Sequence, residues 1–174
     1  MKNFDITKLS VLIVEKHPPM RSMLRGILRE LGIQKIYEAL APESGFETFV
    51  QKSPDLVLID WGPDFDGIRL LDQIRSDEES VNLFAPVIMV TAYGELERVI
   101  EARDAGMTEY LAKPVSAKRL YQRIAVIAES NRSFVRISEF FGPDRRRKNA
   151  ALSTKERRTR ASATNDSHDK SSVA

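Results

Sequence analysis

Five polar residues that could do chemistry each stand at the end of a short apolar run. Glu15 and Lys16 follow the first run, whereas Asp60, Thr91 and Lys113 end or follow three later ones. An aspartate can capture a phosphoryl group as an acyl phosphate. An ammonium group can neutralise the phosphoryl oxygens as they arrive, and a hydroxyl group can then sense them. These residue types suggest phosphoryl capture rather than hydrolysis.

The apolar runs before these residues are typical of buried strands in a parallel sheet. They are short, almost wholly apolar and rich in β-branched residues, and they cover residues 9–14, 55–59, 86–90 and 107–111, with a further candidate at 35–39. Five alternations of strand and helix predict an α/β fold with helices on both faces of the sheet. In such folds the chemistry lies beyond the carboxyl ends of the strands, which is where the five polar residues fall.

Helix signals separate the predicted strands. Pro18-Pro19 can open a helix whose apolar residues keep helical spacing as far as Gly32, which can end it. Further helices are predicted over Pro42–Gln51, after Gly67, over Glu95–Ala105 and after Ser116, where the serine can act as N-cap. The alternation of elements therefore continues to about residue 130.

The composition excludes several classes of protein. The chain has 174 residues and no cysteine, so disulfides, cysteine nucleophiles and cysteine metal sites are absent. Hydrophobic residues make up 42% of it, which is enough to fill a core. No stretch approaches 18 consecutive apolar residues, and the first ten residues lack the apolar core of a signal peptide. We therefore expect a cytoplasmic protein without a membrane span.

Charge is distributed unevenly along the chain. Residues 142–174 carry nine Lys and Arg against four Asp and Glu, whereas the rest carries 18 against 21. Residues 144–174 lack aromatics and are rich in Ser, Thr, Ala and basic residues, so we expect this basic tail to be disordered. It could attract nucleic acid or an anionic membrane, but a solvated tail is favoured because no aromatics are interleaved for base stacking.

The order of motifs VLIVEK, LVLIDW, DG, VIMVTAY and EYLAKP resembles that of the response-regulator receiver family, across roughly residues 8–130. One apolar run that ends in aspartate would be weak evidence, but the complete series at receiver spacing is specific. The resemblance implies a flavodoxin-like, doubly wound (βα)5 fold with a five-stranded parallel sheet in the order 2-1-3-4-5. It also implies a single-domain response regulator of a two-component or phosphorelay system.

By this resemblance, Asp60 would accept a phosphoryl group from a histidine kinase or phosphotransfer protein. Lys113 would contact the phosphate, and Pro114 would hold the following turn in cis geometry. Thr91 would swing its hydroxyl group onto the phosphate. Tyr110 matches the aromatic residue whose rotamer follows that threonine and remodels the face formed by the fourth helix and fifth strand. That face could also form a homodimer.

The resemblance implies a Mg²⁺ site made by Glu15, Asp60 and the backbone carbonyl of Gly62, but the sequence departs from the family pattern twice. Receivers usually carry a second acid where this chain has Lys16, and an ammonium group cannot coordinate a metal that prefers hard oxygen ligands. In addition, the loop between Asp60 and Asp66-Gly67 is one residue shorter than usual. The shorter loop could displace the Gly62 carbonyl.

Counting charges suggests a role for Lys16. An ordinary receiver site has three carboxylates, one lysine and one Mg²⁺, which sum to zero. In this chain Glu15 and Asp60 are balanced by Lys16 and Lys113 without any metal. An ion pair at about 4 Å in a partly screened pocket has a gross attraction of roughly 4 kcal/mol. We therefore expect Lys16 to pair with Asp60, to replace part of the metal charge and to weaken Mg²⁺ binding.

Simpler interpretations stay open for each residue. Lys16 could be a solvated lysine that extends away from the pocket, or it could belong to a pocket that never accepts phosphate. His17 is expected to be a surface histidine rather than a metal ligand or phosphoryl relay. The remaining site residues could have ordinary structural roles: a capping or turn aspartate at Asp60, strand-end polarity at Thr91 and Lys113, a solvated acid at Glu15 and a packed aromatic at Tyr110.

The predicted organisation is a receiver domain over residues 1–131, an apolar extension over 132–143 and the basic tail over 144–174. The apolar residues at 134–141 could pack on the domain or dock a partner. The segment FGPDRRR at 141–147 resembles an ending found in some bacterial single-domain receivers. No helix-turn-helix pattern follows residue 130, so we expect output through protein contact or onward phosphotransfer.

Three functions remain in competition. The favoured one is a phosphorylated receiver, which is not an enzyme beyond its own phosphorylation and slow dephosphorylation, since no Gly-rich phosphate loop is present. The second is a pseudo-receiver, an interaction module held in one conformation by Lys16 and independent of phosphorylation. The third, ranked last, is a nucleic-acid-binding protein that acts through the basic tail.

Overall fold

The computed structural model describes residues 5–62, 64–92, 96–129, 134–137 and 140–143, and within 134–141 it describes the backbone alone. The chain divides into two compact units, Met1–Asp144 and Arg145–Ala174. The second unit, and with it the whole of the predicted basic tail, lies outside the described residues.

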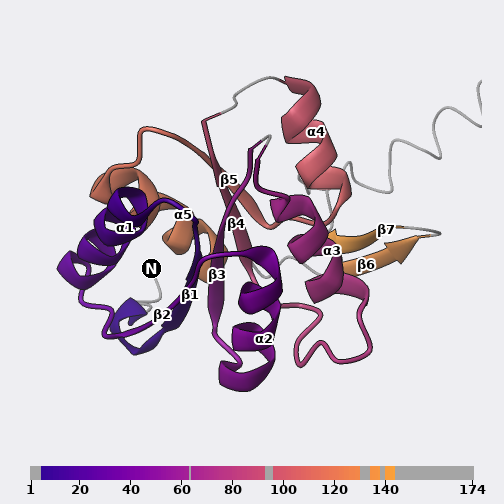
Figure 1. Ribbon diagram of the computed structural model, residues 1–174, viewed down its shortest axis with the longest axis horizontal. Helices are drawn as coiled ribbons and strands as arrows, with labels where there is room; N and C mark the ends of the chain where they lie inside the picture. The colour runs from indigo at the N-terminus through magenta and orange to yellow at the C-terminus, as the bar shows by residue number, and fades with distance from the viewer. Residues whose placement is uncertain (1–4, 63, 93–95, 130–133, 138–139, 144–174) are drawn as a thin grey trace, which may run out of the picture. The chain divides into compact units, whose positions relative to one another are not determined.

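Five parallel strands form one sheet. They are β1 (Ser10–Val14), β2 (Lys35–Ala39), β3 (Leu56–Asp60), β4 (Val87–Thr91) and β5 (Glu109–Ala112). Their order, β2-β1-β3-β4-β5, confirms the predicted flavodoxin-like topology (Figure 1). Every residue of β1, β3 and β4 is buried, which explains why these strands are continuous apolar runs.

Helices cover both faces of this sheet. They are α1 (Pro18–Glu30), α2 (Pro42–Lys52), α3 (Gly67–Ser76), α4 (Leu96–Asp104) and α5 (Ala117–Glu129), preceded by the 3-10 turn Ile6–Lys8. In Figure 1, α1 and α5 lie on one side of the strands, and α2, α3 and α4 lie on the other. The predicted helix bounds agree with these to within a few residues. Among the described residues, no helix is long and apolar enough to cross a membrane.

Each strand contributes to two cores because its side chains alternate between the faces. Val11 and Ile13 of β1 pack in the cluster that contains α1 and α5 residues, whereas Leu12 and Val14 pack in the cluster with α2 and α3 residues. All four side chains are fully buried. Burial of each such side chain contributes about 1.5–3 kcal/mol to folding, so the strands are held firmly from both sides.

Two glycines fix how helices join the sheet. Gly32 has a φ of +90°, a conformation that favours glycine, and it follows the last residues of α1 as predicted. Gly67 begins α3 directly against the end of β3. A Cβ atom at this position would overlap the carbonyl oxygen of Asp60, so only glycine lets α3 begin there. The first turn of α3 is therefore fixed relative to the end of β3.

Residues 134–137 and 140–143 form a strand pair, the β6–β7 hairpin, that the sequence did not predict. The antiparallel strands β6 (Phe134–Ile137) and β7 (Phe140–Pro143) pair with each other. Figure 1 shows this hairpin, in orange, beside α3, and β7 contacts that helix. Gly142 and Pro143 are buried, so this end of the extension packs on the domain.

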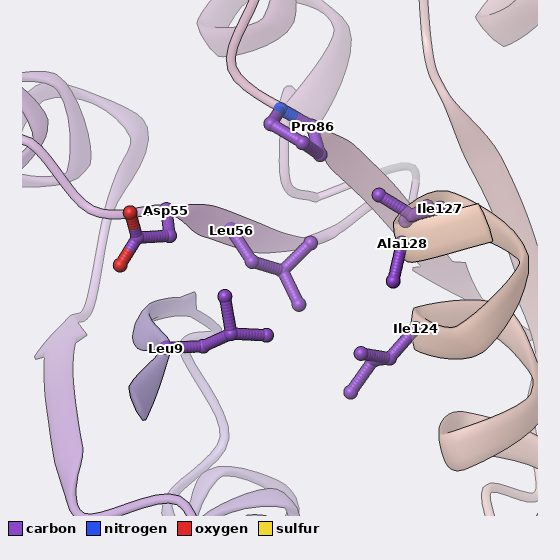
Figure 2. A pocket seen from close by; sticks show the side chains of 7 residues that line it. All are labelled: Leu9, Asp55, Leu56, Pro86, Ile124, Ile127 and Ala128. Atoms are coloured by element: carbon purple, nitrogen blue, oxygen red, sulfur yellow. The ribbon is translucent and has the colours of Figure 1, made fainter. Parts of the chain in front are cut away.

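An apolar cavity of about 210 Å³ lies at the amino-terminal edge of the sheet. Figure 2 shows Leu9 and Leu56 on one side of it, facing α5 side chains such as Ile124. Asp55, the charged residue of the lining, accepts hydrogen bonds from the amide (2.8 Å) and hydroxyl (2.7 Å) of Ser10. The carboxylate is therefore occupied in tying β1 to β3.

Candidate functional site

The polar residues that the sequence analysis singled out meet at the carboxyl-terminal edge of the sheet. Glu15 follows β1, Asp60 ends β3, Thr91 ends β4 and Lys113 follows β5. Because these strands are parallel neighbours, their last residues share one edge. The predicted gathering of Glu15, Asp60 and Lys113 is present as a set of direct contacts.

Lys113 stands at the centre of this set. Its Nζ donates to Asp60 Oδ1 at 2.7 Å and to Glu15 Oε2 at 3.0 Å. Both carboxylates are buried, and the Lys113 side chain is only 16% exposed. Burial by itself would lower the pKa of Lys113, but hydrogen bonds and attraction from Asp60 and Glu15 outweigh it and raise that pKa above its ordinary value. Lys113 is therefore an ammonium group at neutral pH.

Glu15 is held on its other side by His17. Its Oε1 accepts hydrogen bonds from the His17 backbone amide (2.9 Å) and contacts the ring Nδ1 at 3.0 Å. Burial by itself would raise the pKa of Glu15, but the His17 amide and Lys113 outweigh it and lower that pKa below its ordinary value. Glu15 is thus a carboxylate at neutral pH, so Nδ1 must carry the proton in this contact.

His17 is therefore more involved in the site than the sequence analysis expected. One ligand-type atom from each of Glu15, His17 and Asp60 lies within 4.8 Å of the others. The ring remains 62% exposed, as a surface histidine would be. Its proximity to Glu15 arises because both residues flank one short loop between β1 and α1.

Lys16 does not form the expected ion pair with Asp60. Its Nζ lies 3.2 Å from the backbone carbonyl oxygen of Asp64 and 3.8 Å from Asp64 Oδ2. Asp60 Oδ1 is already bound by Lys113, and burying a second ammonium group would cost more than leaving it partly in water. The Lys16 side chain is accordingly 34% exposed, and it reaches across to the loop between β3 and α3.

These side chains line a cavity of about 200 Å³ that opens beside Asp60. Its lining combines the ammonium groups of Lys16 and Lys113 with the carboxylates of Asp60 and Asp64. The full lining is Lys16, His17, Asp60, Trp61, Gly62, Asp64, Phe65, Ala92 and Lys113. A small anion could therefore meet both a carboxylate nucleophile and cationic groups there.

The loop between β3 and α3 closes on itself. Gly62 and Phe65 exchange backbone hydrogen bonds, with N–O distances of 3.2 Å and 3.0 Å. The Gly62 carbonyl, predicted as a metal ligand, therefore accepts the Phe65 amide. Phe65 and the preceding Trp61 are both buried in the core, which anchors the short loop at two points.

Arg21, which was not among the predicted site residues, holds the backbone of the loop between β1 and α1. Its Nη1 donates to the Glu15 carbonyl at 2.8 Å and lies 3.4 Å from the Lys16 carbonyl. Its Nε donates to Glu38 of β2 at 3.0 Å, and Arg25 donates to the same carboxylate at 2.8 Å. The spacing of two arginines four residues apart on one helix face was the signal that could have revealed this brace.

The remaining predicted residues lie on β4 and β5 or shortly after β5. Thr91 is fully buried, and its carbonyl accepts the Lys113 amide at 2.7 Å. The Lys113–Pro114 peptide bond is cis, as the resemblance implied. Tyr110 is half-buried against the core on the α2–α3–α4 side. The switching roles of Thr91 and Tyr110 stay predictions.

The donor set does not fit a hard divalent cation as the side chains stand. Glu15 and Asp60 offer carboxylate oxygens, the ligand type that Mg²⁺ prefers. However, both oxygens of Glu15 already accept hydrogen bonds, as does the Gly62 carbonyl. Lys16 adds a positive charge to the same cavity where a third acid would have added a ligand.

The sequence profile of the response regulator receiver domain matches residues 11–125. Chemotaxis protein CheY-3 of Vibrio cholerae is 36% identical over 122 residues, which are 70% of this chain and 92% of that protein. Chemotaxis protein CheY of Pseudomonas aeruginosa is 34% identical over 122 residues, which are 97% of its length.

Two further relatives extend the comparison. The phosphate regulon transcriptional regulatory protein PhoB of Pseudomonas aeruginosa is 33% identical over 119 residues, which are 68% of this chain and 51% of PhoB. A crystal structure of a putative response regulator from Chloroflexus aurantiacus superposes with a TM-score of 0.63 at 28% identity. That match covers 70% of this chain and 98% of the solved one.

Proposed function

We propose that this chain, which belongs to the response regulator receiver domain family, accepts a phosphoryl group on Asp60 and thereby switches its contacts with other proteins. Receiver domains interact with histidine kinases or phosphotransfer proteins, and such a protein would be the donor. The observation that carries the proposal is the position of Lys113, whose ammonium group binds the Asp60 carboxylate inside a cavity. Any catalysis is confined to the chain's own phosphorylation and slow dephosphorylation.

Phosphorylation would use the oxygen of Asp60 that Lys113 does not bind. Lys113 holds Oδ1, which leaves Oδ2 to attack the phosphorus of a phosphohistidine donor. A P–O bond forms to Oδ2 while the P–N bond breaks, and the leaving imidazole nitrogen takes up a proton from solvent. The product is an acyl phosphate on Asp60 and a neutral histidine on the donor.

Lys113 stabilises this transfer electrostatically. Its ammonium group already bridges Asp60 and Glu15, so it can contact the arriving phosphoryl oxygens without being recruited from elsewhere. Glu15 keeps the ammonium group in place, and His17 keeps Glu15 in place. Thr91, at the end of the adjacent strand, would sense the phosphoryl group with its hydroxyl group.

The phosphoryl-transfer proposal is tested by intact-mass measurement after incubation with acetyl phosphate. We expect the native chain to gain the mass of one phosphoryl group and the Asp60→Asn variant to gain none. Lys113→Met should gain it much more slowly, because the cation that neutralises the incoming oxygens is lost. A native chain that gains no phosphoryl mass from acetyl phosphate or from a phosphorylated histidine donor would contradict the proposal.

We also propose that Mg²⁺, which receiver domains typically bind, binds this chain weakly. Lys16 brings positive charge where a further carboxylate would help an ion, and both Glu15 oxygens and the Gly62 carbonyl already accept hydrogen bonds. A titration followed by Trp61 fluorescence tests this, because Trp61 lines the same cavity. We expect saturation only at millimolar Mg²⁺, and micromolar binding would contradict it.

A pseudo-receiver is the second candidate, and Lys16 is the observation that favours it. If Lys16 prevents transfer, the native chain stays unmodified in the mass experiment, whereas Lys16→Asp gains a phosphoryl group. The nucleic-acid alternative depended on the basic tail, which lies wholly outside the described residues, so the structure adds no support to it.

A further inference from the structure

We propose that Lys16 is an internal cross-link that ties together the two loops of the cavity and replaces a bound divalent ion in that task. The loop between β1 and α1 carries Lys16, and the loop between β3 and α3 carries Asp64. A lysine ammonium group donates to hard oxygen acceptors, the same kind of atom that a divalent ion would bind. The inference concerns the folding of the cavity, so it does not depend on whether Asp60 is phosphorylated.

The contact is made between residues 48 positions apart in the sequence. Lys16 Nζ lies 3.2 Å from the Asp64 carbonyl oxygen, within hydrogen-bonding distance, and 3.8 Å from the carboxylate of the same residue. The carbonyl is the closer partner and belongs to the backbone, so the contact restrains the loop itself. Lys16 is 34% exposed and Asp64 is 86% exposed, which places the contact on the solvent side of the cavity.

The Lys16 end of the cross-link is anchored. Arg21 donates to the Glu15 carbonyl at 2.8 Å and lies 3.4 Å from the carbonyl of Lys16 itself. Arg21 is in turn paired with Glu38 of the edge strand β2, and its side chain is only 15% exposed. The backbone from which the lysine extends is therefore fixed to α1 and the sheet.

The Asp64 end is anchored as well. Asp64 lies between Gly62 and Phe65, whose paired backbone hydrogen bonds close the loop around it. Phe65 is buried in the core, and Asp66 caps α3 by accepting the Arg69 amide at 3.0 Å. A bond between two anchored backbones transmits restraint, whereas a bond between two free side chains would not.

The ammonium groups already present oppose the entry of an ion in this position. Asp60 and Glu15 are already neutralised in part by Lys113, which binds both. Lys16 supplies the remaining positive charge to the cavity. A divalent ion entering there would have to approach two ammonium groups, so the cross-link and the ion compete for the same role.

Amide hydrogen exchange of the native chain and three variants, measured without divalent ions, tests the inference. In Lys16→Met, the side-chain length is kept and the ammonium group is lost. We expect the Phe65 and Gly62 amides to exchange about threefold to tenfold faster, while amides of β1 and β3 stay unchanged. Asp64→Asn keeps the carbonyl and should change exchange less. Lys8→Met, which breaks the exposed Lys8–Asp5 pair, is the matched control and should leave the loop unchanged.

Adding Mg²⁺ separates the cross-link from an ordinary surface contact. The native chain should show no further protection of the Phe65 amide at Mg²⁺ concentrations that protect it in Lys16→Asp, because the native loop is already tied. Unchanged loop exchange in Lys16→Met would overturn the inference. Equal protection of native and Lys16→Asp chains by Mg²⁺ would also overturn it. Neither readout involves phosphoryl transfer, so failure of the proposed function would not mimic either result.

Discussion

Glu15, Asp60 and Lys113 form one cluster of mutually compensating charges. The Lys113 ammonium group binds two buried carboxylates, at 3.0 Å and 2.7 Å. Among the described residues, neither carboxylate has a second ammonium partner. A buried pair that loses one member leaves an uncompensated charge, which costs much more than an exposed pair does. The stability of this site therefore rests on Lys113.

Replacing Lys113 with methionine should destabilise the fold by about 3–5 kcal/mol, because two carboxylates then remain buried without their cation. Urea unfolding at pH 7 measures the change, and Lys8→Met at an exposed pair should leave stability almost unchanged. Adding Asp60→Asn to Lys113→Met should recover part of the loss. A fully additive double variant would show that the two residues do not interact.

Glu15 should give the native chain a measurable dependence on acid. Its folded-state pKa lies below the ordinary value of 4.5, so its stabilising contribution is complete above pH 4.5 and is lost as pH falls through the folded-state value. The free energy of unfolding should therefore fall more steeply below pH 4.5 for the native chain than for Glu15→Gln. If the free energy of unfolding falls equally steeply with pH in the native chain and in Glu15→Gln, the lowered pKa of Glu15 is contradicted.

For single residues, the sequence predicted where the polar side chains lie better than which atoms they contact. Glu15, Asp60 and Lys113 were predictable as neighbours because the ends of parallel strands share one edge. The partner of Lys16 was not, because its side chain can extend toward either loop. The choice of Asp64 over Asp60 depends on how the short loop presents a carbonyl, which residue types alone do not encode.

Arg75 shows how elements on the α3 side are joined. Its guanidinium group is buried at the end of α3, where Nε donates to the Gly106 carbonyl and Nη1 to the Leu83 carbonyl, each at 3.0 Å. Burial lowers the pKa of Arg75 to about 9, so it still carries its charge at neutral pH. The side chain thereby ties α3 to the segments before β4 and after α4.

Replacing Arg75 with methionine should lower the free energy of unfolding by about 2–4 kcal/mol, because two carbonyl groups lose charged donors. Arg75→Lys should lose less, since one charged donor remains. Thermal and urea unfolding at pH 7 measure both variants. A methionine variant as stable as the native chain would mean that water replaces the arginine without cost.

A contact between Arg98 and Trp61 joins α4 to the loop after the proposed phosphoacceptor. The guanidinium carbon of Arg98 lies 5.3 Å from the centre of the Trp61 ring. Arg98→Ala should shift Trp61 emission and cost about 0.5–1 kcal/mol, whereas Arg98→Lys should keep most of the interaction. Identical emission spectra for the native and alanine chains would show that the contact does not persist in solution.

Element types and order followed from the sequence because buried parallel strands are apolar runs and the helices have periodic apolar faces. The paired strands β6 and β7 were not predictable from the sequence in this way. Their residues were recognised as apolar, but a two-stranded hairpin has no helix–strand alternation to reveal it. The Gly62–Phe65 bridge was missed for a related reason, since it is made by backbone atoms that any residue type supplies.

At the scale of the whole molecule, the β6–β7 hairpin adds to the five-stranded fold. Since β7 contacts α3 and its last residues are buried, a chain that ends after Glu129 should expose part of α3. We expect this truncation to lower the free energy of unfolding by about 1–2 kcal/mol, the amount expected for uncovering roughly one side chain. Phosphoryl transfer to Asp60 should persist. Unchanged stability would show that the hairpin does not stabilise the domain.

The close packing of the backbone at Gly67 means that this position cannot accept any other residue during evolution. Alanine, the smallest replacement, would already press its methyl group into the Asp60 carbonyl, so either the helix or the end of the strand would have to retreat. A comprehensive substitution library should therefore return no tolerated replacement for Gly67. The position least tolerant of substitution would then be a glycine, whose side chain is a single hydrogen atom.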